Sequence, residues 1–359
     1  MKTMLLVMYY NNLGNTGIKV SAYCLGAMMF GAWGNQDEND CIKIIDRAID
    51  AGINFIDTAD VYSNGESEKI VGKALSGKRD KLVLATKVHG SMGDDINERG
   101  NSRRWITREI ESSLKRLNTD YIDLYQIHRP DPTTDITETL SVLTDLVHQG
   151  KILAFGSSTF DPELIVESQW VSEKRNLERF VCEQPPYSLL TRQIERSVLP
   201  TCAKYNMGVI VWSPLAGGWL SGKYIKESDV DLSQGRAGRM PARFDPSIPG
   251  NRLKLDRVNE LLQIAQSIDT SLAHLAMSFV LSHPAVTSAI IGPRTMSQLE
   301  DILKSIDLEL SDEVLDKIDG VIKPGENLNT ADGGWQPPSL TNIKLRRKRY
   351  AAPTPASEW

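Results

Sequence analysis

Short apolar runs recur along the chain, and each is followed by a segment whose apolar residues repeat at helical spacing. Strands that alternate with helices are typical of parallel βαβ units, and nearly continuous apolar strands indicate a sheet covered on both faces. Eight such runs predict a closed (β/α)8 TIM barrel, an α/β fold. An open doubly wound sheet is the alternative. The runs span residues 19–29, 53–59, 82–88, 121–128, 152–158, 179–184, 208–214 and 286–292.

Helix boundaries are marked by local signals between these runs. A hydroxyl or carboxylate at the N-cap, a first-turn proline, a Thr-x-x-Gln capping box and a terminal glycine are each typical of a helix end. The residues that supply these signals are Ser102, Asp161, Pro162, Thr295 with Gln298, Gly52 and Gly150.

Three segments fall outside the alternation. Residues 215–250 form a long loop with Gly, Arg and Pro after the seventh strand, and loops of that length are usually functional or disordered. Residues 324–359 are expected as a C-terminal loop over the barrel mouth and a basic tail, KLRRKRY, which is either solvated or has a nucleic-acid or targeting role. Residues 1–11 are expected as a disordered leader or an extra edge strand, within one domain that spans residues 1–323.

Composition narrows the function classes. With 41% hydrophobic residues, 24% charged residues and a net charge of −5, the chain resembles ordinary globular proteins and has no basic stripe for nucleic acid. No apolar run approaches the ~20 residues that span a bilayer, and the N-terminus lacks the pattern of a signal peptide. The four cysteines form no CxxC pair and the five histidines have no metal-ligand spacing. We therefore expect a cytoplasmic protein with reduced thiols, no metal, and neither nucleic acid nor membrane as a partner.

Polar residues stand where successive apolar runs end: Asp57, Lys87, His128, Ser158 with Thr159, Gln184, and Trp212 with Ser213. In a parallel barrel these ends converge on one face, where active sites lie. Taken singly, Asp57 is explained as a turn former, His128 as a structural histidine and Lys87 as a surface lysine. An acid, a base and an imidazole on one face are costly together, so the set indicates chemistry.

Tyr62, five residues after Asp57, adds a phenol to this face. A phenol has a pKa of about 10, and we expect the Lys87 ammonium to lower it while Asp57 keeps the lysine charged. An N–H of His128 could hold a carbonyl oxygen. Such a site suits protonation of an alkoxide as a hydride reaches carbon, whereas the residues for acyl transfer or glycoside hydrolysis are missing.

The source of the hydride is not a Rossmann unit, because no strand is followed by G-x-G-x-x-G. The segment GGWLSGKY at 217–224 resembles a P-loop but has Tyr224 where Ser or Thr is needed, so we reject ATP binding. Arginines are better candidates for a phosphate clamp, with ordinary surface arginines as the alternative. They are Arg236, Arg239, Arg243 and Arg294.

Seven motifs carry a family pattern: INFIDTADVY (53–62), LATKV (84–88), SLKRLNTDYIDLYQIHRPD (113–131), GKILAFGSS (150–158), EQPPYSLL (183–190), VWSPLAGGWLSGKY (211–224) and AIIGPRTMSQLED (289–301). In order and spacing they resemble the aldo-keto reductase superfamily over about residues 12–320. The details are most similar to the branch of potassium-channel β-subunits and their bacterial relatives.

The resemblance implies a role for each matching residue. The catalytic tetrad would be Asp57, Tyr62, Lys87 and His128, with Tyr62 as the general acid. The cofactor would be NADP(H), with its nicotinamide at Ser158, Gln184 and Trp212, its pyrophosphate at Ser213, Leu215, Ser221 and Lys223, and its adenosine and 2′-phosphate at Arg294, Gln298 and Asp301. The chain departs from the family pattern at Thr159 and Ile302, where Asn is common, and at Asp301, where Glu is more frequent.

The implied function is NADPH-dependent reduction of a small aldehyde or ketone. We expect apolar substrate walls from Met28, Phe30 and Trp33 in the first loop and Trp335 in the C-terminal segment. The alternatives are an NADP(H)-binding regulatory or scaffold subunit, or a dedicated sugar or polyketide ketoreductase. His128 favours an enzyme, because regulatory β-subunits can have Asn at this position. Relatives in this branch often assemble, which allows a homo-oligomer.

Overall fold

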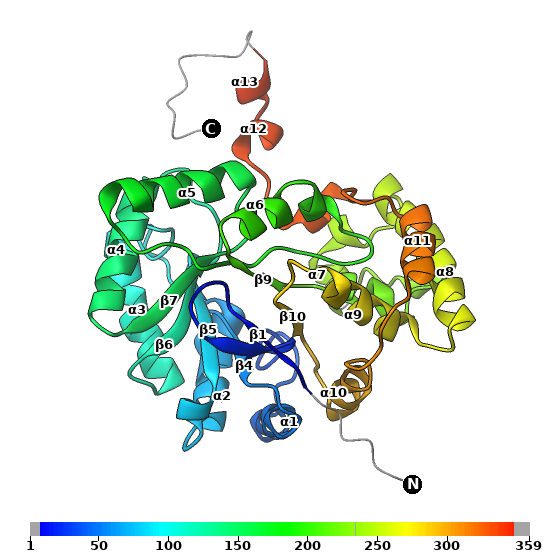
Figure 1. Ribbon diagram of the computed structural model, residues 1–359, viewed down its shortest axis with the longest axis horizontal. Helices are drawn as coiled ribbons and strands as arrows, with labels where there is room; N and C mark the ends of the chain where they lie inside the picture. Colours follow the sequence, from blue (N-terminus) through cyan, green and yellow to red (C-terminus); the bar gives the residue numbers. More distant parts are fainter. Residues whose placement is uncertain (1–7, 234, 348–359) are drawn as a thin grey trace.

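The computed structural model describes residues 8–233 and 235–347. Eight parallel strands close into a barrel in the order β10-β3-β4-β5-β6-β7-β8-β9 (Figure 1). The predicted (β/α)8 barrel is thus confirmed, and the open sheet is wrong. The strands are β3 (Tyr23–Gly26), β4 (Phe55–Asp57), β5 (Val83–Val88), β6 (Ile122–Ile127), β7 (Ile152–Ser157), β8 (Cys182–Glu183), β9 (Gly208–Val211) and β10 (Ser288–Ile291).

Helices surround the barrel (Figure 1). Those that alternate with the strands are α1 (Glu38–Asp50), α2 (Glu66–Ala74), α3 (Arg103–Leu117), α4 (Ile136–His148), α5 (Pro162–Arg175), α6 (Val198–Lys204), α9 (Leu272–Ser282) and α10 (Met296–Leu303). Helix α1 packs against α2 on one side and α10 on the other, which closes the outer ring. Two further helices, α8 (Pro249–Ser267) and α11 (Asp312–Val321), pack against each other beside it. No helix of the described residues is both long and apolar enough to cross a membrane.

Hydroxyl side chains start two of the predicted helices. Ser102 accepts a hydrogen bond from the backbone of the third residue of α3, and Thr295 does the same for α10. Asp161 stands at the N-cap of α5 without a side-chain cap bond. Gln298 Oε1 accepts a hydrogen bond from the backbone N–H of Arg294 at 2.8 Å instead of that of Thr295. The expected reciprocal capping box is therefore displaced by one residue.

Inward-facing side chains change from apolar to polar along the barrel strands. The apolar part is one cluster: Leu13, Val20, Cys24, Phe55, Val83, Ala85, Leu124, Ala154, Cys182 and Ile210. Because strand side chains alternate between faces, the next inward positions after Phe55, Ala85 and Leu124 are two residues further on. Those positions hold Asp57, Lys87 and Gln126, all buried. The sequence thus builds a polar layer at the C-terminal end of the barrel, called the mouth below.

An N-terminal hairpin closes the opposite end of the barrel (dark blue in Figure 1). Strand β1 (Tyr10–Asn12) pairs antiparallel with β2 (Lys19–Ser21), and Leu13 is fully buried in the inner cluster. Asn11 Nδ2 donates to Thr287 O at 2.8 Å, just before β10. The run at 19–29 is therefore two strands instead of one, and the expected leader ends inside β1. Residues 1–7 of that leader lie outside the described residues.

The connection after β9 carries several short helices and receives the C-terminal segment. They are η4 (Ala216–Ser221), η5 (Glu227–Asp229), α7 (Gly235–Arg239) and η6 (Pro241–Arg243). Asp332, in η7 (Thr330–Gly333), pairs with Arg243 at 2.6 Å and with Lys254 of α8 at 2.5 Å. Beyond it, α12 (Pro338–Thr341) and α13 (Ile343–Arg346) extend away from the barrel (Figure 1). Residues 348–350 of the basic cluster lie outside the described part of the chain.

Candidate active site

Four predicted catalytic side chains meet at the barrel mouth. Asp57 ends β4, Lys87 lies in β5, His128 follows β6, and Tyr62 begins the short helix η1 (Tyr62–Gly65) after β4. The parallel register sets Asp57 beside Ala85, two residues before Lys87 on the neighbouring strand. Convergence of parallel strand ends therefore gathers residues that are far apart in the sequence.

The ammonium of Lys87 lies at the centre of this group. Its Nζ donates to Asp57 Oδ1 at 2.5 Å and to Thr58 O at 2.8 Å, and lies 3.4 Å from Tyr62 OH. Lys87 is completely buried, whereas Tyr62 and His128 are partly exposed. The Tyr62 and His128 rings meet edge to face with centroids 5.7 Å apart. The four side chains thus form one contact network.

Two glutamines complete the surroundings of Asp57. Gln126 Nε2 donates to Asp57 Oδ2 at 3.1 Å, and Gln184 Nε2 donates to the same oxygen at 2.9 Å. Gln184 was expected to hold a cofactor amide, while Gln126 was missed. The available signal was its place in YIDLYQIH, because a residue two positions before His128 in a strand faces the same side.

The electrostatics keep Lys87 charged. Burial alone lowers its pKa, but the Asp57 carboxylate, Tyr62 and the hydrogen bonds to both together raise it above its usual value. A buried ammonium is stable only with such partners. Asp57 therefore acts on the site by holding Lys87 protonated and in place.

Tyr62 differs from the sequence expectation. Burial raises the pKa of its phenol, and this outweighs the lowering caused by Lys87. The expected net decrease is wrong, because desolvation of the phenolate depends on packing that the sequence did not reveal. Tyr62 is consequently a phenol with its proton in place at neutral pH.

His128 is neutral in this environment. Burial lowers its pKa well below the usual range, and the nearby Arg129, Lys87 and His89 lower it further. An uncharged imidazole has one N–H donor and one acceptor nitrogen. His128 is thus suited to hydrogen bonding at the mouth and not to carrying charge.

The residues expected around a nicotinamide lie beside this network. Ser158 Oγ donates to Gln184 O at 2.8 Å, and both residues are buried. Trp212 directly follows β9, and its buried Nε1–H has no hydrogen-bond partner among the described residues. Buried donors are normally paired, so this orphan indicates a place where a ligand oxygen would fit.

The remaining expected cofactor residues lie in outer loops. Leu215 and Ser213 are partly buried, while Ser221, Lys223, Arg294, Gln298 and Asp301 are exposed. The side chains of three of them already have intramolecular partners: Ser221 Oγ donates to Gly218 O at 2.7 Å, Gln298 Oε1 accepts from Arg294 N, and Asp301 Oδ1 lies 3.4 Å from His274 Nε2. Ile302, at a departure from the family pattern, is buried in the core.

The arginines of the long loop form a positive cluster. Burial and the charges of Arg243, Arg239 and Arg294 lower the pKa of Arg236 to about 10. Arg236 has no acidic partner among the described residues, so an anion there would relieve the repulsion. Arg243 is different, because its Nε donates to Asp332 Oδ1 at 2.6 Å. The expectation that Arg243 is free to bind a phosphate is therefore corrected: Arg243 belongs to a structural ion pair.

The expected substrate walls differ in exposure. Trp33 is 39% exposed, and its ring centroid lies 6.0 Å from that of Tyr62. Met28 and Trp335 are partly buried. Phe30 is completely buried in the main core. The expectation that it lines the substrate pocket is therefore corrected: it packs beneath the first loop. Gly334, beside Trp335, packs so closely on Trp212 that a β-carbon would lie 2.6 Å from Cζ2.

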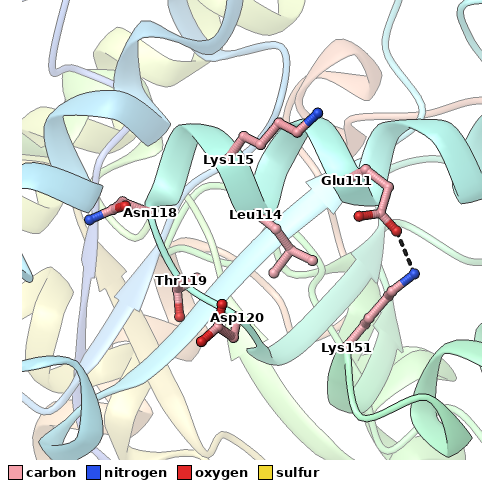
Figure 2. A pocket seen from close by; sticks show the side chains of 7 residues that line it. All are labelled: Glu111, Leu114, Lys115, Asn118, Thr119, Asp120 and Lys151. Carbon is pink, nitrogen blue, oxygen red and sulfur yellow. Dashed lines mark hydrogen bonds and ion pairs between the residues drawn. The ribbon is translucent and has the colours of Figure 1, made fainter.

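A surface hollow at the other end of the barrel contains none of these residues. Figure 2 shows Lys151 directed toward Glu111, with which it forms an ion pair. The hollow lies where α3 ends and where β6 and β7 begin, so it faces away from the mouth. Its lining is Glu111, Leu114, Lys115, Asn118, Thr119, Asp120 and Lys151. Within the described residues, no cluster of His, Cys, Asp and Glu could hold a metal ion.

Comparisons with known proteins agree with the geometry. The model of the aldo/keto reductase family matches residues 22–323. The "Uncharacterized oxidoreductase YrpG" of Bacillus subtilis is 39% identical over 90% of this chain and 99% of its own length. The "Probable voltage-gated potassium channel subunit beta" of Oryza sativa subsp. japonica is 35% identical over 88% of this chain and 97% of its own. "Aldo-keto reductase YhdN" of B. subtilis is 38% identical over 82% and 87%.

Proposed function

The chain belongs to the aldo/keto reductase family of oxidoreductases, and from this premise we propose that it reduces an aldehyde or ketone to an alcohol with NADPH. One observation carries the proposal. Lys87 Nζ lies 2.5 Å from Asp57 Oδ1 and 3.4 Å from Tyr62 OH, with His128 against the Tyr62 ring. This arrangement supports proton delivery to a carbonyl oxygen.

The chain offers donors and charges that fit the cofactor. Ser158, Gln184 and the unpartnered Nε1–H of Trp212 would hold its nicotinamide part. The choice of NADPH over NADH rests on the arginine cluster, because a 2′-phosphate adds negative charge. When bound, the cofactor supplies the hydride. The residues proposed for its phosphates and adenosine are Ser213, Leu215, Ser221, Lys223, Arg236, Arg239, Arg294, Gln298 and Asp301.

In the proposed mechanism, Tyr62 and His128 receive the substrate oxygen. Tyr62 OH and the N–H of neutral His128 donate hydrogen bonds to it and stabilise the negative charge that develops there. The Tyr62 O–H bond breaks as a new O–H bond forms on the substrate oxygen. The resulting phenolate is stabilised by the Lys87 ammonium, 3.4 Å away. Asp57 keeps that ammonium charged throughout.

Tyr62→Phe tests this mechanism. The variant keeps the ring but loses the proton donor, so turnover should fall by about 10²–10⁴-fold while NADPH affinity stays nearly unchanged. Loss of NADPH absorbance with an aromatic aldehyde measures turnover, and a fluorescence titration measures binding. Near-normal turnover in the variant contradicts the mechanism.

A second candidate function is that of an NADP(H)-binding regulatory or scaffold subunit. It is favoured by the relative named as a probable potassium channel subunit beta. Bound NADPH that is not oxidised by any member of a carbonyl panel supports this candidate. The same panel, extended with sugar ketones and polyketide fragments, distinguishes a dedicated ketoreductase. The proposal includes a cytoplasmic location, supported by four free, buried cysteines. Homo-oligomerisation stays a prediction.

A further inference from the structure

Arg129 lies at the mouth next to the catalytic network but has no place in the mechanism above. Its Nη1 donates to the backbone oxygen of His128 at 2.5 Å, and its Cζ is 6.0 Å from the ring centroid of Trp212. Its charge contributes to the lowered pKa of His128 and acts to lower the pKa of Tyr62. The guanidinium thus stands close to both groups proposed to receive the substrate oxygen.

Two other arginines that are largely buried have acidic partners, whereas Arg236, which also lacks one among the described residues, is already proposed to bind the cofactor phosphates. Arg116 pairs with Glu68 and Glu109, and Arg192 pairs with Glu195 and Asp319. Arg129 makes no ion pair within residues 8–233 and 235–347. An unpaired charge away from bulk water costs free energy, so its retention needs a ligand or a function.

Glu183, the acid whose charge acts on Arg129, does not neutralise it. Burial raises the pKa of Glu183 to about 8, so this carboxyl is largely protonated at neutral pH. Its oxygens already accept hydrogen bonds from Ser157 Oγ at 2.5 Å and from Phe160 N at 3.2 Å. Glu183 is therefore a structural acid, and Arg129 keeps an uncompensated positive charge.

The free donors of Arg129 are accessible. A guanidinium has five N–H groups, of which the structure pairs only one within the described residues. Arg129 is partly exposed, and its other nitrogens are not among the fully covered side-chain atoms that lack a partner, so a ligand can contact them. A planar fork of this kind matches the two oxygens of a carboxylate.

We propose that Arg129 binds a carboxylate on the substrate, so that the preferred substrates are aldehydes or ketones that bear a carboxylate near the carbonyl. This inference rests on the proposed carbonyl reduction. One carboxylate neutralises one guanidinium, whereas a dianionic phosphate would leave surplus negative charge, because Lys87 is already paired with Asp57. Arg129 is therefore assigned to substrate choice and not to proton transfer.

Paired substrates test the assignment. The ortho, meta and para isomers of carboxybenzaldehyde are compared with their methyl esters, which keep the ring and the aldehyde but carry a neutral ester in place of the carboxylate. The wild type should prefer at least one acid over its ester in kcat/KM. Arg129→Met should reduce that preference by about tenfold to a hundredfold, because a charge-assisted hydrogen bond is lost. Arg129→Lys should retain part of the preference, since it keeps the charge but loses the fork.

The matched control is Arg103→Met. Arg103 forms an exposed ion pair with Asp145 between the outer helices α3 and α4, with side chains 44% and 49% exposed, so the variant removes the same charge from a solvent-exposed pair. Its acid-to-ester preference should equal that of the wild type. Thermal unfolding checks that each variant folds, and the Lys variant still tests the inference if Arg129→Met does not.

Three results overturn the inference: equal kcat/KM for acids and esters in the wild type, equal losses for both in Arg129→Met, or weakened NADPH affinity with an unchanged preference. If no aldehyde oxidises NADPH, the proposed function fails separately. Calorimetry with para-(hydroxymethyl)benzoate, a carboxylate-bearing alcohol product, then tests Arg129 alone. Binding by the wild type and its loss in Arg129→Met support the inference; no binding, or equal binding by both, overturns it.

Discussion

Lys87 and Lys254 are both completely buried, and each forms an ion pair with a buried aspartate at 2.5 Å. Their electrostatic surroundings nevertheless differ. Lys87 has Asp57 to itself, and its pKa is raised. Lys254 shares Asp332 with Arg243, and its pKa is lowered by burial and by that second cation. The same pair of residue types therefore holds a charged ammonium beside a phenol at the barrel mouth, whereas at Asp332 it joins the C-terminal segment to α8 and stabilises the fold.

Both lysines also donate to a backbone oxygen, Lys87 to Thr58 O at 2.8 Å and Lys254 to Arg243 O at 3.0 Å. What separates them is a phenol, because Lys87 Nζ additionally lies 3.4 Å from Tyr62 OH. Only a phenol can exchange a proton with substrate. A buried Lys–Asp pair is therefore not a sign of catalysis by itself. Catalysis is indicated when a group that can donate a proton lies beside the pair.

Lys87→Met should give the largest effect. Without the ammonium, the Tyr62 phenolate has no nearby cation, so turnover should fall by about 10²–10⁴-fold. The measurement is NADPH oxidation with a good aldehyde at saturation. Lys254→Met is the matched control and should keep turnover within a few fold. Equal losses in the two variants would remove the distinction between them.

Asp332→Asn should produce the next largest effect, on stability. It leaves Arg243 and Lys254 as two buried cations without an acid, which costs about 3–5 kcal/mol. Urea unfolding followed by fluorescence gives the free energy of unfolding. Asp145→Asn, in the exposed pair with Arg103, should cost about 0–1 kcal/mol. If Asp332→Asn loses no more unfolding free energy than this control, the stabilising role of the Asp332 ion pairs is contradicted.

Glu183 provides a third case, a buried acid without a paired cation. Its folded pKa is about 8 against a usual 4.5, so the folded state holds a proton that the unfolded chain releases between these values. The stability that this bound proton contributes is fully present below a pH of about 4.5 and is lost as the pH rises toward about 8, a loss on the order of 5 kcal/mol. Glu183→Gln should flatten this decline in unfolding free energy measured against pH. An unchanged slope contradicts it.

Arg294→Ala should have the smallest effect. The side chain is exposed, so loss of a phosphate contact should weaken NADPH binding by about 1–2 kcal/mol, or about tenfold. NADH, which lacks the 2′-phosphate, should bind with nearly unchanged affinity. Fluorescence titration with both cofactors measures the difference. Equal weakening of the two would remove the reason for preferring NADPH.

The barrel and the meeting of strand ends were predictable from the sequence. Side chains of a strand alternate between its two faces, and helices alternate with strands along the chain. Both patterns can be recognised in short stretches of sequence, so the sequence predicts that Asp57 and Lys87 point into the barrel. The boundary between the hairpin strand β2 and the barrel strand β3 was not predictable, because the run at 19–29 is apolar across the point where β2 ends and β3 begins.

Long-range pairing and burial were not predictable. The sequence predicts a phosphate ligand at Arg243 because its partner, Asp332, is 89 residues away and no spacing connects the two. It predicts Phe30 in the wall of the substrate pocket because an aromatic residue in a loop fits a pocket and a core equally well. The direction of the Tyr62 pKa shift depends on burial and Asp57, which raise the pKa, against Lys87 and Arg129, which lower it, and only the packed structure gives this balance.

The closure of the barrel has a consequence for biosynthesis. Strand β10 pairs with β3, so Ala289 lies beside Tyr23. A ribosome must therefore release nearly the whole barrel sequence before the ring can close around the Lys87 ammonium. Until then the nascent chain carries a lysine and an aspartate without the packing that makes their pairing strong, and such open intermediates are the ones that chaperones protect.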